Sequence, residues 1–143
     1  MYDSLLVATD GSEAATTAIE HAVGLATRLE IPVYGIAVLE SRTEYDNAIV
    51  DPAEVEQRRR AAAESALEYL EEQAAAADVP VETTIRSGVP HEEVLAYADE
   101  RDAGAVVIGA RGRSSFKRAL LGATVDRIVR LADRPVLVVG DAE

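Results

Sequence analysis

The residues with the most distinctive chemistry lie in one segment, GARGRSSFKRALLGATV, at 109–125. Three glycines occur there, and glycine permits a positive φ and lets backbone N–H groups approach an anion closely. The last of them, Gly122, directly precedes an apolar helical pattern. Because the free amides and the positive dipole end of a helix N-terminus attract phosphate, the segment predicts a phosphate-binding loop that leads into a helix.

The same segment is basic, although the chain as a whole is strongly acidic. Its cations are Arg111, Arg113, Lys117 and Arg118, and no Asp or Glu occurs within 110–125. The chain carries 26 acidic and 14 basic residues, for a formal charge of −12. A basic cluster in such a chain indicates an anion site. The alternative is a basic face that pairs with acids elsewhere, such as those of the second helix.

A second polar segment, Asp10-Gly11-Ser12, follows the first apolar run. Asp-Gly is typical of a turn, and Asp or Ser often caps the helix that follows. We favour a ligand role for Asp10 over a purely structural one, because the end of the first strand is expected to border the binding crevice of the sheet.

Apolar runs and helical patterns alternate along the chain, and these elements must position the two segments. The runs expected to form strands are 4–9, 32–39, 81–86, 105–109 and 135–139. Helical spacing predicts helices over 12–29, from about 52 to 77, from Pro90 onward, and over 124–132. The polar stretch 40–52 is expected to be the longest loop.

This alternation predicts one α/β domain over residues 1–143, a doubly wound five-stranded parallel sheet with helices on both faces. Ligands bind such sheets beyond the carboxyl ends of the strands, where the winding direction reverses. If strands one to three wind one way and four and five the other, the reversal lies between strands one and four. The loops leaving those strands begin at Asp10 and Gly109.

Composition excludes several kinds of site. The absence of cysteine removes disulfides, thiol catalysis and cysteine-ligated metals. Two isolated histidines make no metal site; we expect His21 to be structural and His91 to be solvated at a helix start.

The sequence has no apolar stretch of membrane-spanning length and no basic leader, so we expect a cytoplasmic protein without a membrane partner. The negative charge disfavours nucleic acid.

Other functional classes lack their motifs. No glycine is followed by Lys and then Ser or Thr, as a Walker loop requires, and no G-x-G-x-x-G follows the first strand. A phosphoryl-accepting receiver domain would carry an aspartate at the end of strand three, where this chain has Ile85-Arg86-Ser87-Gly88. The run Arg58-Arg59-Arg60 is expected to be a solvated helix face that pairs with nearby glutamates.

The spacing Gly109-x2-Gly112-x9-Gly122 resembles the ATP-binding signature of the universal stress protein family. Further matches are Asp10-Gly11-Ser12, Gly88 and Pro90 before the third helix, Leu120-Leu121-Gly122, and the closing run 134–139. The resemblance covers essentially the whole chain except the loop at 40–52, and it implies the strand order 3-2-1-4-5.

By this resemblance the chain is an ATP-binding regulatory module of the stress response, with slow hydrolysis at most and no residue placed as a strong general base. Asp10 is expected to contact the ribose or a Mg²⁺ ion bound with the nucleotide, and backbone around Val38 to border the adenine. The residues expected to bind the nucleotide are Ala8, Thr9, Asp10, Val38, Gly109, Arg111, Gly112, Arg113, Gly122, Ala123 and Thr124.

One residue departs from the ATP-binding pattern. Members that bind ATP usually carry Ser or Thr directly after the third glycine, whereas this chain has Ala123 and then Thr124. A lost hydroxyl would cost about 1–3 kcal/mol, or roughly five- to a hundredfold in affinity, unless Thr124 compensates. The alternative function is therefore a family member that binds no nucleotide and acts as a dimeric interaction scaffold.

The resemblance also implies partners. Family members commonly form homodimers through the last strand, which here begins at Pro135 and ends at Val139. That strand is short and wholly apolar, so its unpaired edge would promote aggregation if it stayed exposed. A regulatory protein of unknown identity is the other expected partner.

The acidic composition predicts a dependence of stability on salt, and Lys117 is the single lysine of the chain. At about 1 M salt the Debye length falls to roughly 3 Å, so a dense acidic shell is screened and supports solubility. We favour adaptation to molar salt over an ordinary acidic protein. The melting temperature should then rise steeply between low salt and molar KCl, and a flat melting temperature over that range would contradict the adaptation.

Overall fold

The structure, a computed structural model, describes residues 2–40, 52–111 and 122–140. Its elements are, in chain order, β1 (Leu5–Ala8), α1 (Glu13–Leu29), β2 (Val33–Glu40), α2 (Pro52–Ala76), β3 (Val81–Gly88), α3 (Pro90–Arg101), β4 (Ala105–Gly109), α4 (Ala123–Leu131) and β5 (Val136–Val139). The alternation expected from the sequence is confirmed. Most of the loop expected at 40–52 lies outside the described residues.

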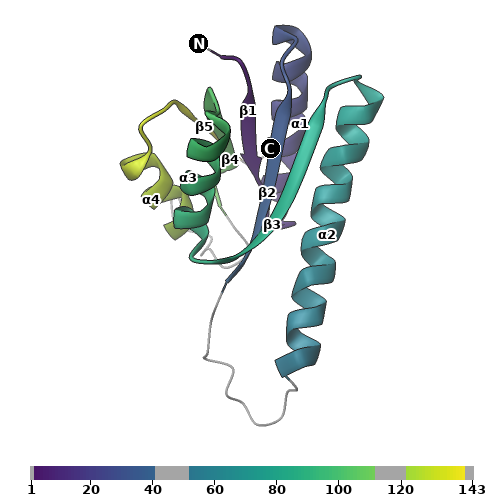
Figure 1. Ribbon diagram of the computed structural model, residues 1–143, viewed down its shortest axis with the longest axis vertical. Helices are drawn as coiled ribbons and strands as arrows, with labels where there is room; N and C mark the ends of the chain where they lie inside the picture. The colour runs from purple at the N-terminus through teal and green to yellow at the C-terminus, as the bar shows by residue number, and fades with distance from the viewer. Residues whose placement is uncertain (1, 41–51, 112–121, 141–143) are drawn as a thin grey trace.

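The five strands form one parallel sheet in the order β3-β2-β1-β4-β5, as expected. Strand β1 pairs in parallel with β2 on one side and β4 on the other, so the winding reverses between β1 and β4. Helices α1 and α2 cover one face of the sheet, and α3 and α4 cover the other (Figure 1). Within the described residues, no helix has the length and apolar character needed to cross a membrane.

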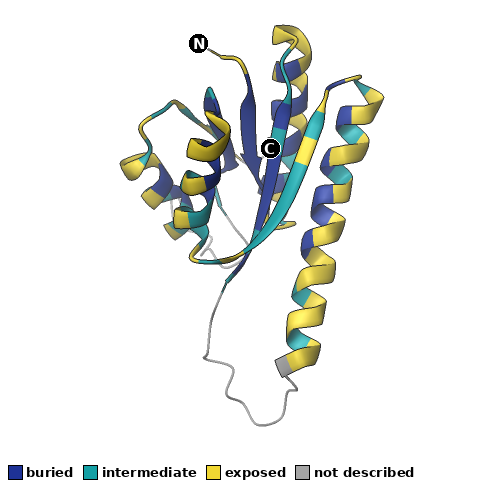
Figure 2. Ribbon diagram, in the orientation of Figure 1, coloured by how far each residue is buried: buried dark blue, intermediate teal, exposed yellow. Residues whose placement is uncertain are grey.

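Buried apolar residues pack on both faces of the sheet, because successive side chains of a strand point in opposite directions. In β1, Leu5 and Val7 belong to the core under α1 and α2, whereas Leu6 and Ala8 belong to the core under α3 and α4. Figure 2 shows the buried residues along the centre of the sheet and the exposed ones on the outer sides of the helices. A central strand buried on both faces explains the unbroken apolar run at the start of the chain.

Helix α1 begins at a capped turn. The Ser12 hydroxyl oxygen accepts a hydrogen bond from the backbone N–H of Ala15 at 3.2 Å, as the sequence predicts for an N-cap. The buried face of the helix consists of Ala14, Ala15, Ala18, Ile19, Ala22, Val23 and Ala26. Leu29 shares the helical spacing of this face but is 43% exposed, because it lies in the last turn, next to Glu30, where the chain leaves the helix with φ 58°.

Arg134, just before β5, forms hydrogen bonds with residues at the end of α3. Its guanidinium donates to the carbonyl oxygens of Ala103 at 2.6 Å and Ala98 at 3.2 Å, and to Asp99 Oδ1 at 2.6 Å. The Ala98 carbonyl also accepts from the backbone N–H of Ala103 at 3.0 Å, so the guanidinium adds a charged donor to an already bonded helix end and ties it to the segment before β5. The first residue of the closing run 134–139 is therefore structural.

Strand β4 packs very closely against α1 at Gly109. A Cβ atom at this position would lie 2.7 Å from the backbone carbonyl carbon and oxygen of Ala14, closer than real Cβ contacts allow. Neither described glycine of the loop uses the positive φ that glycine permits: Gly109 is not among the residues with positive φ, and Gly122 has φ −70°. Gly109 is required for close approach, since any side chain would push the helix away.

Replacing Gly109 with Ala should lower the free energy of unfolding by about 1–3 kcal/mol, the usual cost of an overpacked contact. Gly24→Ala in α1 is the matched control, because nothing lies within 4 Å of its added Cβ. Ala is favoured over Gly in a helix by about 1 kcal/mol, so this second variant should be as stable as the wild type or more so. Urea denaturation measures both, and equal stabilities for the two variants would contradict the packing argument.

Candidate functional site

A cavity of about 560 Å³ opens at the carboxyl ends of the strands, a volume within the usual range of small-ligand sites. Its walls come from the ends of β1, β2 and β4, the first turns of α3 and α4, and α2. Figure 1 shows the N-terminal part of α2 projecting beyond the sheet at this end of the molecule. The cavity therefore lies at the switch point between β1 and β4, with α2 as an additional wall.

The described residues that the sequence singled out for nucleotide binding all line this one cavity. They are Ala8, Thr9, Asp10, Val38, Gly109, Arg111, Gly122, Ala123 and Thr124. Gly112 and Arg113 lie outside the described residues, as do Lys117 and Arg118. Segments that are far apart in the sequence thus meet because parallel strands end at the same edge of the sheet.

Asp10 both shapes its turn and lines the cavity. Its Oδ1 accepts a hydrogen bond from the backbone N–H of Ser12 at 3.0 Å, and Gly11 N–H donates to Thr9 Oγ1 at 3.2 Å. Gly11 has φ 81°, a backbone conformation that residues other than glycine rarely adopt. The turn role of Asp10 is therefore confirmed, and the turn holds the carboxylate at the cavity.

Helix α4 begins at the cavity wall. Gly122 is its N-cap, in extended conformation and without a side-chain hydrogen bond to the first turn. The backbone N–H of Gly122 donates to the carbonyl of Ala110 at 3.0 Å, which ties the helix start to the end of β4. Thr124 lines the cavity, so a hydroxyl group is present one residue after the position where the resemblance expects it.

The two sides of the cavity differ in character. On the β2 and α2 side, the lining consists of the apolar residues 36–39, Ala62 and Ala63, with Glu40 and Arg59 beside them. On the β4 and α4 side, it includes Arg111, Thr124 and Arg127. An elongated ligand with an apolar end and an anionic end would match this division.

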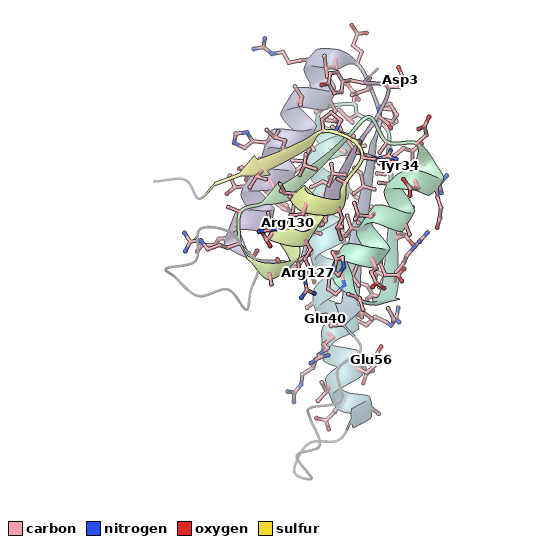
Figure 3. The ribbon with its side chains drawn as sticks, turned by 90° about the vertical axis from the view of Figure 1, so that its left-hand side faces the viewer. Asp3, Tyr34, Glu40, Glu56, Arg127 and Arg130 are labelled. Carbon is pink, nitrogen blue, oxygen red and sulfur yellow. The ribbon has the colours of Figure 1, made fainter. Side chains whose placement is uncertain are left out.

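The charge of the cavity lining is opposite in sign to the net charge of the chain. Its described lining holds three arginines, Arg59, Arg111 and Arg127, against two carboxylates, Asp10 and Glu40. The whole chain, by contrast, has a formal charge of −12. Figure 3 shows the labelled Arg127 and Glu40 toward the same end of the molecule, on α4 and β2 respectively. An excess of cations in this cavity favours an anionic ligand.

Sequence reasoning missed part of this lining. Arg58 and Arg60 pair with Glu54 and Glu56 one turn away, at 3.3 and 3.7 Å, as expected of a solvated face. Arg59 instead lines the cavity, and its Nη1 donates to the carbonyl oxygen of Glu40 at 3.3 Å. Its spacing from the buried residues could have shown this, because positions 59, 63 and 67 lie on one face of a helix.

His91, expected to be solvated, also lines the cavity from the first turn of α3. That helix is anchored by Tyr97, whose ring is 2% exposed and packs edge-on against Tyr34 at a centroid distance of 6.2 Å. The guanidinium of Arg86 lies 4.9 Å from the same ring, and burial raises the pKa of the Tyr97 hydroxyl. The anchor fixes α3 on the sheet and with it the position of His91.

Comparison with known proteins identifies relatives along the whole chain. A universal stress protein of Methanocaldococcus jannaschii, MJ0531, is 28% identical over 97% of this chain and 82% of its own length. The universal stress protein YxiE of Bacillus subtilis is 31% identical over 97% of this chain and 99% of its own.

Solved structures agree with these relatives. The structure of protein MJ0577 superposes with a TM-score of 0.85 at 26% identity, covering 100% of this chain and 99% of the other. The universal stress protein UspA of Lactobacillus plantarum gives a TM-score of 0.84 at 26% identity, covering 96% of this chain and 97% of the other. The model of the universal stress protein family matches residues 1–140. The chain belongs to the universal stress protein family.

Proposed function

We propose that the cavity binds ATP, and that residues 1–143 act as one nucleotide-binding regulatory module of the stress response with little or no turnover. The observation that carries the proposal is the charge of the cavity, whose described lining has more arginines than carboxylates in a chain of formal charge −12. Surface acids repel an anion over most of the molecule, so a polyphosphate is attracted where cations gather.

The shape of the cavity supports a nucleotide over a simple anion. A purine ring is flat and mostly apolar, which suits the lining at Ile36, Val38 and Ala63. The phosphates would then extend toward the start of α4, where the first turn presents backbone N–H groups that lack partners within the helix. The hydroxyl of Thr124 lies on that side and would take the place of the one absent at Ala123.

Related structures give further support. A universal stress protein in complex with cAMP has a TM-score of 0.75 at 24% identity, and one from Archaeoglobus fulgidus in complex with dAMP has 0.72 at 21%. Those ligands are properties of those proteins, and the likeness at these identities is one of fold. For this chain, the proposal depends on the residues of its own cavity.

Mg²⁺ would enter together with the nucleotide. This ion is usually held by one or two carboxylates and by the phosphates of the substrate. Asp10 is a carboxylate at the strand end of the cavity, and the described residues contain no group of three or more His, Cys, Asp or Glu that could hold a metal ion alone. The chemistry of these donors fits an ion that neutralises phosphate charge as part of Mg-ATP.

Isothermal titration with Mg-ATP in molar KCl tests the nucleotide proposal. The wild type, freed of co-purified nucleotide, should bind one ATP per chain, and Gly122→Asp should abolish binding by placing a negative charge at the start of α4. Arg111→Glu should weaken binding at least tenfold, because it removes one charge-assisted hydrogen bond and adds repulsion. Arg58→Glu is the matched control, since Arg58 pairs with Glu54 outside the cavity.

Absence of binding by nucleotide-free wild-type protein would overturn the proposal and leave the scaffold as the function. Equal losses for Arg111→Glu and Arg58→Glu would show that the general charge of the protein, and not this cavity, governs affinity.

We also propose that the protein forms a homodimer through β5. This strand is at the edge of the described sheet, and Leu137 on it is 42% exposed next to Leu25 of α1. A second copy would cover this apolar surface and pair the open edge. Light scattering during gel filtration should give the mass of a dimer for the wild type and of a monomer for Leu137→Asp. A monomeric wild type would refute the dimer.

A further inference from the structure

Arg127 lines the cavity, yet it forms no hydrogen bond or ion pair within the part of the chain that the structure describes. Most other described arginines are held by acceptors of the protein itself, and the exception, Arg28 of α1, lies outside this cavity. Arg130, one turn further along α4, donates from Nε to both carboxylate oxygens of Asp126 at 3.1 Å. In a chain with 26 acidic residues, a cavity arginine that no described acid engages is available for a ligand.

The position of Arg127 on α4 directs it toward the start of the helix. Side chains of a helix lean toward its N-terminus, and residues three positions apart lie on one face. Arg127 follows Thr124 by three residues, and both line the cavity. The guanidinium therefore extends toward the first turn of α4, where the N-cap residue Gly122 provides no side-chain hydrogen bond.

We propose that Arg127 contacts the phosphates beyond the first one, so that the cavity selects nucleoside di- and triphosphates over monophosphates. This inference rests on the proposed nucleotide function and adds the feature that distinguishes one adenine nucleotide from another. Arg127 is then a specificity-determining residue of the site.

The reason for the selectivity is the separation of the cations along the cavity. Arg111 follows the end of β4, and Arg127 lies one turn into α4, so the two approach a ligand from different elements. With the base on the β2 and α2 side, a phosphate chain extends toward α4 and can engage both. A monophosphate offers a single anionic group, so the contact with Arg127 is lost while the base and the first phosphate stay in place.

Titrations with ATP, ADP and AMP, each with Mg²⁺, test the inference on the wild type and on Arg127→Gln. The variant should bind ATP about ten- to a hundredfold more weakly, the usual effect of losing a hydrogen bond between charged groups. Its affinity for AMP should change less than threefold, so the ratio of the ATP to the AMP affinity should collapse. Arg127→Lys keeps the charge and should retain most of this ratio.

Arg130→Gln is the matched control, because it removes the same charge from the same helix at a residue that is already paired. Equal losses for ATP and AMP in Arg127→Gln, or no loss for either, would overturn the role of Arg127 while leaving the nucleotide proposal intact. Failure of the wild type to bind any of the three nucleotides would instead refute the nucleotide proposal itself, and the inference with it.

Discussion

At Gly109 the end of β4 packs directly against the backbone of Ala14, and the position of the cavity depends on this contact. It holds the first turn of α1 beside the ends of β1 and β4, the two strands between which the sheet changes its winding direction. The turn at Asp10 and the start of α4 therefore face one space. Strand β1, buried on both faces, makes the arrangement rigid, because neither side of it can shift without disturbing a core.

The distribution of charge distinguishes the cavity from the rest of the protein surface. The chain has a formal charge of −12, but the cavity gathers arginines from α2, from the segment after β4 and from α4, which lie far apart in the sequence. On the outer faces of the helices, by contrast, arginines pair with acids one turn away, as Arg58 does with Glu54 and Arg130 with Asp126. The same residue type thus stabilises helices on the surface and concentrates positive charge at the switch point.

Much of the fold could be predicted from the sequence, because apolar spacing and turn residues are local signals. The parallel sheet, the Ser12 cap and the gathering of Asp10, Gly109 and Gly122 at one edge all follow from such signals. Local signals could not show that Gly109 serves packing, since the backbone of Ala14 arrives from a distant segment. Nor could they separate Arg127 from paired surface arginines, because exposure to a cavity and exposure to solvent leave the same pattern in a sequence.

The central claim is that a nucleotide binds at the carboxyl ends of β1 and β4. The most direct measurement is a titration of ¹⁵N-labelled protein with Mg-ATP, followed by amide chemical shifts. If the claim is right, the largest changes occur at Asp10, Arg111 and Thr124, which line the cavity, and Leu25 and Leu137 at the far edge stay unchanged. Unchanged amides at the cavity under saturating ATP, or changes confined to the edge at β5, would contradict it.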